Sequence, residues 1–168
     1  MAFYFSYQTF VSFATYDDLI QRDQRILEAN EGLTQAEIDE YLKQAAARIL
    51  TQIRNTSWWR GYAFGQDSSL QRDLRLLPSV TPSRILSREQ EFKDLNIYFA
   101  LYEYILPSVA DFGNPESADI AKIKHYKDSY DRLFTELIES GDWYDFDGDL
   151  SIELTERSPN RQNFVRIR

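Results

Sequence analysis

The stretch Leu33-Thr-Gln-Ala-Glu-Ile-Asp-Glu-Tyr-Leu-Lys43 carries the clearest helix signature in the chain. Thr34 and Glu37 have the spacing of a capping box, in which the two side chains satisfy the first free N–H groups of a helix. Beyond this cap, apolar residues recur at helical spacing, at Ile38, Leu42, Ala45, Ile49 and Ile53. The pattern predicts an amphipathic helix that ends near Asn55.

The chain before this helix predicts an arm and a first, shorter helix. Residues 3–13 are aromatic and β-branched, which favours an extended N-terminal arm over residues 1–14. Thr15 can cap a helix whose first turn carries Asp17 and Asp18, where negative charge is favourable. We expect Asn30-Glu-Gly32 to stop this helix.

Residues 65–86 predict a long surface loop, with a short helical turn at 69–76. Loops of this length in compact domains are usually functional. This one carries Arg72, Arg75 and Arg84 in an otherwise acidic protein. We therefore expect the loop to contact another subunit or a partner.

A second capping box, Ser87 with Gln90, predicts a helix that runs to about Leu106, where Pro107 ends it. This helix is apolar nearly all round, which is typical of a helix at the centre of a bundle or at a subunit interface.

Asn114 can cap a fourth helix with Pro115 at its first position, and Gly141 can stop it. The sequence therefore predicts a mainly α fold, an antiparallel bundle of about four helices over residues 15–140 with extended N- and C-terminal arms. The residues expected deepest in its core are Leu95, Phe99, Leu133 and Leu137.

The totals exclude several classes of protein. At 168 residues the chain is long enough for one domain with a real core. It has no cysteine, and no apolar run reaches the ~20 residues that a membrane helix needs. The net charge of −8 argues against a nucleic-acid binder that relies on phosphate contacts. The aromatic content of 15% indicates extensive contact surface.

The segment from Asp145 to Glu156 can be laid on the calcium loop of an EF-hand. Its carboxylates at positions one, three, five, nine and twelve are Asp145, Asp147, Asp149, Glu153 and Glu156. Position six should be glycine, whereas Leu150 resists a positive φ. No exiting helix is expected, since Pro159 follows closely. Two readings stay open: a weak Ca²⁺ site, the one cofactor the sequence suggests, or an acidic turn whose aspartates bind backbone N–H groups.

Other chemical signals are weaker. The run Arg60-Gly-Tyr-Ala-Phe64 matches the start of an RNA-recognition signature, but that motif belongs on a strand and here follows a long helix. The alternative is that Trp58 and Trp59 plug the bundle or a neighbouring subunit. His125 is the only histidine and is expected to face solvent, so zinc sites and histidine-activated nucleophiles lack a second group. We expect no catalytic residues.

The C-terminal segment 157–168 holds four arginines and no acid, whereas Glu136–Glu156 holds eight acids and no base. Within the segment, Asn163-Phe-Val-Arg-Ile-Arg168 alternates as a strand does. It can be a disordered end, or it can add a strand to a sheet on another chain.

The layout resembles head–tail connector proteins of tailed bacteriophages, also called adaptor or head-completion proteins. The resemblance is carried by Tyr16-Asp-Asp-Leu19, by Leu33–Lys43, by the apolar pair of later helices, and by Gly141-Asp-Trp-Tyr-Asp-Phe-Asp-Gly-Asp149 before a short basic end. It covers roughly residues 15–168.

The resemblance implies a structural protein of the virion neck, assembled in the host cytoplasm, and not an enzyme. It implies a ring of about twelve copies that joins the portal to tail or neck proteins. DNA is expected to pass through the ring without sequence-specific binding, and no membrane is expected as a partner. An acidic lining would let DNA slide. The residues expected to bind partners are Trp58, Trp59, Arg72, Arg75, Arg84, Arg161, Phe164, Arg166 and Arg168. A soluble, EF-hand-like, calcium-responsive binding module is the alternative.

Overall fold

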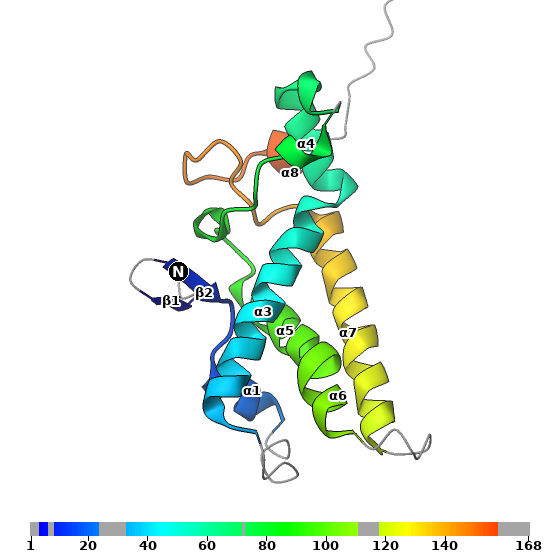
Figure 1. Ribbon diagram of the computed structural model, residues 1–168. Helices are drawn as coiled ribbons and strands as arrows, with labels where there is room; N and C mark the ends of the chain where they lie inside the picture. Colours follow the sequence, from blue (N-terminus) through cyan, green and yellow to red (C-terminus); the bar gives the residue numbers. More distant parts are fainter. Residues whose placement is uncertain (1–3, 7–8, 24–32, 72, 111–117, 158–168) are drawn as a thin grey trace, which may run out of the picture. The chain divides into compact units, whose positions relative to one another are not determined.

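The computed structural model describes residues 4–6, 9–23, 33–71, 73–110 and 118–157, which are mainly helical, as the sequence predicts (Figure 1). No helix among these residues is long and apolar enough to cross a membrane. The elements in chain order are β1 (Tyr4–Ser6), β2 (Thr9–Ser12), α1 (Tyr16–Arg22), α3 (Gln35–Arg54), α4 (Ser57–Gln66), three 3-10 helices (Ser68–Gln71, Leu74–Leu76 and Pro82–Arg84), α5 (Glu89–Ala100), a π-helix (Leu101–Ile105), α6 (Leu106–Val109), α7 (Ala118–Ser140) and α8 (Leu154–Arg157).

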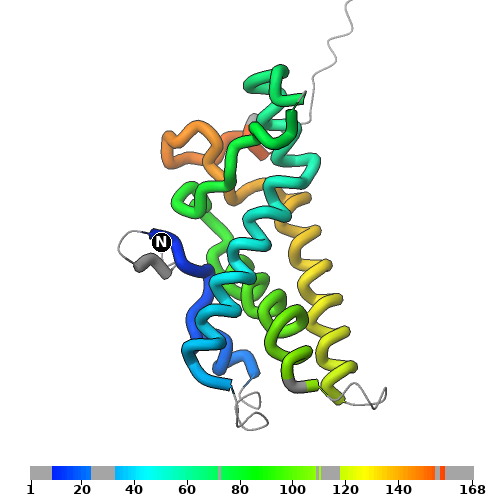
Figure 2. Tube along the Cα trace, in the orientation of Figure 1, coloured from blue at the N-terminus to red at the C-terminus, as the bar shows by residue number. Residues whose placement is uncertain are grey.

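The chain forms two compact units, each made of two separate segments that Figure 2 lets the reader follow by colour. The first unit consists of Met1–Ile49 and Arg88–Glu136, and the second of Leu50–Ser87 and Leu137–Arg168. Helices α3 and α7 each begin in the first unit and end in the second. The division between the two units therefore falls within α3 and α7.

The predicted caps of the first two helices are present. Thr15 and Asp18 form a capping box at the start of α1. At α3, the Glu37 carboxylate accepts from the backbone N–H of Thr34 at 2.8 Å, and the Thr34 hydroxyl accepts from the N–H of Glu37. The residues expected to stop the first helix, 30–32, lie outside the described part of the chain.

The N-terminal arm is extended, as expected, and it is folded into a hairpin. Strands β1 and β2 pair antiparallel, with Phe5 opposite Phe10 and Ser6 opposite Thr9. Immediately after β2, Phe13 and Ala14 are buried in the first unit. The arm is thus continuous with the core.

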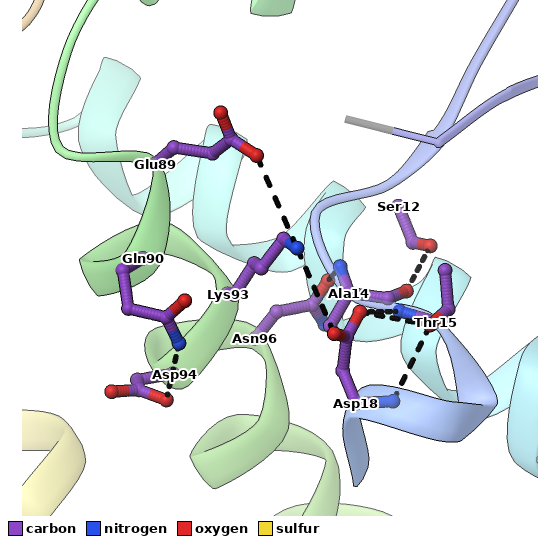
Figure 3. A network of polar contacts seen from close by, with 9 residues as sticks. All are labelled: Ser12, Ala14, Thr15, Asp18, Glu89, Gln90, Lys93, Asp94 and Asn96. Atoms are coloured by element: carbon purple, nitrogen blue, oxygen red, sulfur yellow. Dashed lines mark hydrogen bonds and ion pairs between the residues drawn. The ribbon is translucent and has the colours of Figure 1, made fainter. Parts of the chain in front are cut away.

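A buried asparagine fastens this segment to the helices (Figure 3). The Asn96 side-chain oxygen accepts from the backbone N–H groups of Phe13, at 2.9 Å, and Ala14, at 3.3 Å. Its amide nitrogen donates to the carbonyl of Leu42 in α3 at 3.0 Å. One side chain on α5 therefore holds both the arm and α3.

The start and the end of α5 differ from the expectation. The capping box of Ser87 and Gln90 does not form: the Ser87 hydroxyl donates to the Asp142 carbonyl, and Arg88, in the left-handed region at φ 59°, stands at the N-cap. Nor does Pro107 end the helix. The backbone widens into the π-helix before it and continues as α6, because a π-type turn accommodates a proline that cannot donate to the preceding turn.

The core of the first unit is rich in aromatic contacts between helices. Phe99 lies edge-on to Tyr130 with ring centroids 5.2 Å apart, and Tyr98 stacks on Tyr126 at 5.9 Å. Of the residues expected deepest, Leu95 and Phe99 are fully buried, as is Leu137 in the second unit, but Leu133 is only half-buried. The prediction is therefore wrong for Leu133, which lies on α7 but is not in the deep core.

The second unit contains a helix that the sequence did not predict. Helix α4 covers residues 57–66, and its N-cap is Thr56, whose hydroxyl accepts from the N–H of Trp59. Gly61 and Gly65 lower the helix propensity of this segment. Packing compensates, since Trp58 and Trp59 are both buried and contact the rings of Trp143, Tyr144 and Phe146.

Candidate functional site

The acidic loop lies in the second unit and begins on a short pairing of backbone. Ile85 forms an antiparallel bridge with Tyr144, and the N–H groups of Leu86 and Asp145 donate to the carbonyls of Trp143 and Arg84, both at 2.9 Å. Gly141 ends α7 at φ +57°, as expected, and an added Cβ there would collide with the backbone of Arg157. The entrance to the loop is therefore fixed.

The first half of the loop follows the path of a calcium loop. One oxygen of buried Asp145 accepts from the N–H of Gly148, and the other accepts from the N–H of Leu150 at 3.0 Å. Leu150 has φ +67°, in the left-handed region that the template requires at this position. The expectation that a leucine would resist this conformation is corrected, because the Asp145 carboxylate holds the N–H of Leu150 in place.

Three of the five expected ligand residues come together. One carboxylate oxygen from each of Asp145, Asp147 and Asp149 lies within 4.8 Å of the others. Asp147 and Asp149 also each accept one backbone N–H, from Asp149 at 3.1 Å and Ser151 at 2.8 Å. The loop therefore has features of both readings, an acidic turn and converging carboxylates.

The other two expected ligands are not part of this group. The buried carboxylate of Glu156 accepts from the N–H of Phe146 at 2.7 Å and from the N–H of Glu153 at 2.8 Å. Glu156 thus ties the two ends of the loop together. The second of these bonds caps α8, so a single helical turn does begin at position ten of the template, contrary to the expectation that none would follow.

Asp145 and Asp147 have opposite pKa shifts. Burial acts to raise the pKa of Asp145, but the N–H groups of Gly148 and Leu150 outweigh it, and the pKa lies below its ordinary value. For Asp147 the N–H of Asp149 acts to lower the pKa, but burial and the carboxylates of Asp149 and Glu156 raise it overall. Asp147 therefore faces uncompensated negative charge, which a cation would relieve.

A pocket of about 310 Å³ opens beside the loop. Its lining joins the acidic loop to α4 through Gly61, Tyr62, Gly65, Gln66, Asp147, Glu153 and Glu156. Burial, then the carboxylates of Glu156 and Asp147, raise the pKa of the Tyr62 phenol, which keeps its proton to donate. With three carboxylates and no basic residue in its lining, the pocket suits a cation or a hydrogen-bond donor.

The sequence missed Tyr62 and Gln66 as lining residues because it did not place them on a helix. Their spacing of four residues puts them on one helix face, but Gly61 and Gly65 hid that pattern. The same helix overturns the RNA-recognition reading of residues 60–64, since that motif needs a strand.

The residues expected to bind partners fall into four groups. Trp58 and Trp59 are buried among the aromatic side chains of the second unit. Arg84 is half-buried and donates to the Phe146 carbonyl at 2.6 Å, so it supports the acidic loop. Arg75 is exposed and pairs with Asp73 at 3.0 Å. Outside the described residues lie Arg72, Arg161, Phe164, Arg166 and Arg168.

His125 is exposed on α7, as expected. Comparison of the chain with protein-family models, with curated proteins and with solved structures found no match.

Proposed function

We propose that the chain is a structural subunit of a phage neck, in which copies form a ring that joins the portal to the tail and lets DNA pass. The proposal rests on the layout that resembles head–tail connectors and on one feature of the structure. That feature is an ordered turn of the second unit that presents leucines to solvent.

The turn is residues 74–76, a 3-10 helix. Leu74 is 46% exposed and Leu76 is 64% exposed, and the Arg75 side chain between them is 90% exposed. Large apolar side chains held outward next to an arginine are typical of a protein interface. Because both leucines are already partly covered, burying their remaining surface against a partner would together contribute about 1.5–3 kcal/mol, the value of roughly one fully buried leucine.

Arg54 fixes the backbone of this turn by hydrogen bonds, so the two leucines project from a rigid segment. Leu77 is buried, and the Arg54 guanidinium donates to the Leu77 carbonyl at 2.7 Å and to the Arg75 carbonyl at 2.9 Å. A fixed surface loses less entropy on binding than a mobile loop.

The test is binding of the full chain to the portal protein encoded in the same genome, followed by analytical ultracentrifugation. We expect a complex with many copies of the chain for each portal ring. Leu74→Ser with Leu76→Ser should weaken it by at least about tenfold, the loss expected for roughly one fully buried leucine.

The matched control is Leu150→Asn. Leu150 is also a large exposed apolar residue, but it lies on the acidic loop, and asparagine tolerates its backbone conformation. Equal binding of the wild type and the Leu74/Leu76 variant would remove the support that this turn gives. A chain that never associates with the portal would contradict the proposed function itself.

A calcium-responsive binding module is the second candidate, and the observation that favours it is the loop path at Asp145 and Leu150. The expected affinity is weak, ~10⁻⁴ M or weaker, because only three carboxylates converge. Calorimetry with Ca²⁺ on the full chain, with Asp147→Asn as the comparison, tests this candidate. Heat that Asp147→Asn abolishes supports it, and absence of heat removes it.

A further inference from the structure

A second, larger cavity lies in the first unit, beside the hairpin. Its volume is about 750 Å³. One wall is β2, with all four of its residues, and the other is the start of α3, with Gln35, Ala36, Asp39, Glu40 and Lys43. Neither the acidic loop nor the exposed leucines belong to this cavity.

The β2 wall offers backbone to a further strand. Among the described residues the sheet has two strands, β1 and β2, so β1 covers one long edge of β2 and no strand lies along the other. An unpaired edge in a groove is the arrangement that peptide-binding domains use to accept an added strand.

The wall is rigid where it meets the core (Figure 3). Ser12 donates its hydroxyl to the Ala14 carbonyl at 2.6 Å, and Asn96 holds Phe13 and Ala14 by their N–H groups. Lys93, between Asp18 at 3.6 Å and Glu89 at 3.9 Å, fixes α1 against α5. The groove is therefore built before anything binds to it.

The lining of the groove is acidic. Glu40 pairs with Lys43 at 3.4 Å, which leaves Asp17 and Asp39 without an ion pair among the described residues. Burial, and then the negative charge of Asp17, raise the pKa of Asp39. Two neighbouring carboxylates with no cation are suited to an arginine, which can bind carboxylates by paired hydrogen bonds.

The chain itself contains a segment with the matching chemistry. Residues 165–168 alternate apolar and basic side chains, and the segment 158–168 has Arg161, Arg166 and Arg168 and no acid. Six extended residues span about 20 Å, which exceeds the length of β2. We propose that the groove between β2 and α3 receives residues 163–168 of a second copy of this chain as an added strand, with Arg166 and Arg168 at Asp17 and Asp39.

In this arrangement backbone hydrogen bonds to β2 supply affinity, and alternate side chains supply register. Phe164, Arg166 and Arg168 share one face of the strand, so both arginines can reach the acidic wall while Val165 and Ile167 face the other way. The contact is head-to-tail, which is the kind that closes a ring. The inference thus rests on the proposed ring and names the contact that would close it.

The experiment uses the absence of cysteine from the sequence. One full-length copy carries Thr9→Cys, in the groove, and a second copy of different tag size carries Val165→Cys, in the arm. The two are mixed, alone and together with the portal protein, and oxidised. We expect a disulfide-linked heterodimer, and Ser69→Cys, exposed in the second unit, should not replace Thr9→Cys.

Charge variants add a second readout. Asp17→Asn with Asp39→Asn, or Arg166→Gln with Arg168→Gln, should lower the yield of heterodimer at least about tenfold. Asp128→Asn with Asp131→Asn, exposed on α7 in the same unit, makes the same change of charge and should leave the yield unchanged.

Three results would overturn the inference. They are cross-linking to Ser69→Cys as efficient as to Thr9→Cys, charge variants with unaltered yield, and absence of the heterodimer between the Thr9→Cys and Val165→Cys copies. If a ring forms on the portal without the Thr9–Val165 link, the inference fails and the proposed function stands. If no ring forms, the proposed function fails, whatever the cross-linking shows.

Discussion

At the scale of single residues, Asp145 and Leu150 decide the conformation of the acidic loop. The Asp145 carboxylate accepts from two backbone N–H groups, and one of them belongs to Leu150 at φ +67°. A leucine in the left-handed region costs roughly 1–2 kcal/mol, which the Asp145 contact offsets. The sequence predicted the carboxylates of the loop. It did not predict that the Asp145 contact would offset the strain at Leu150, because helix and turn propensities contain no contribution from a buried side-chain contact.

Leu150→Gly should stabilise the loop, since glycine adopts φ +67° without strain. If the loop follows the calcium path, the same change should also tighten Ca²⁺ binding. Calorimetry with Ca²⁺ on both proteins measures the second effect. Detectable heat for neither protein would leave only the acidic-turn reading.

The shifted pKa values of Asp145 and Asp147 predict opposite effects of pH on the stability of the protein. The folded pKa of Asp145 lies below its unfolded value of about 3.9, so its contribution to stability is present above that value and is lost as pH falls through the folded pKa. The folded pKa of Asp147 is raised, so its contribution is present at low pH and is lost as pH rises through the folded pKa. At pH 7, Asp145→Asn should lower the free energy of unfolding, and Asp147→Asn should not.

Urea unfolding of the two variants between pH 3 and pH 7 measures this difference. Each variant is the control for the other, because both remove one negative charge from the same loop. Equal destabilisation by both at pH 7 would show that the carboxylates act only through their shape.

At the scale of elements, α7 allows a paired test of the core. Leu137 is 2% exposed, and Leu137→Ala should cost about 2–5 kcal/mol of unfolding free energy. Leu133 lies one turn earlier and is half-buried, so Leu133→Ala should lower the free energy of unfolding by clearly less than Leu137→Ala does. Denaturant unfolding measures both, and a loss below about 1 kcal/mol for Leu137→Ala would mean that this residue is not in the core.

The helices that the sequence predicted well are those whose signals are local. The capping box of Thr34 and Glu37 and the apolar spacing behind it give the bounds of α3 almost to the residue. Helix α4 was not predicted because its two glycines disfavour a helix. The aromatic residues that stabilise it, Trp143 and Phe146, are far away in the sequence. The continuation past Pro107 depends on a π-helix, and the proline itself predicted that the helix would end.

The candidate site divides in the same way. Asp145, Asp147 and Asp149 could be predicted, because their spacing is that of a known loop. The role of Glu156 could not, since its choice of backbone N–H groups over the other carboxylates depends on the fold. The groove beside β2 is lined by two separate stretches of sequence, residues 9–17 and residues 35–43. No sequence motif marks either stretch as part of a groove.

At the scale of the whole molecule, the protein is mainly helical and forms two compact units, each with a surface suited to contact. The described part of the second unit carries the exposed leucines and the acidic loop, and the first carries the acidic groove. In the proposed contact, the arginines of segment 158–168 of a second copy meet the carboxylates of the groove. These features favour a subunit that binds its neighbours over a protein that acts alone.

Deletion of residues 158–168 should leave the melting temperature of the isolated chain nearly unchanged, because Phe164, Val165 and Ile167 alone bury too little surface to offset the entropy of ordering. The same deletion should reduce incorporation into assemblies with the portal. Thermal unfolding and sedimentation measure the two effects. A truncated chain that unfolds would show that the segment packs on its own core.

Electron microscopy of the full chain assembled on the portal protein encoded in the same genome tests the central claim most directly. The account predicts a closed ring of identical subunits, about twelve, coaxial with the portal and with an open channel for DNA. Portal particles that remain bare, or that carry the chain as scattered single copies without a ring, would contradict it.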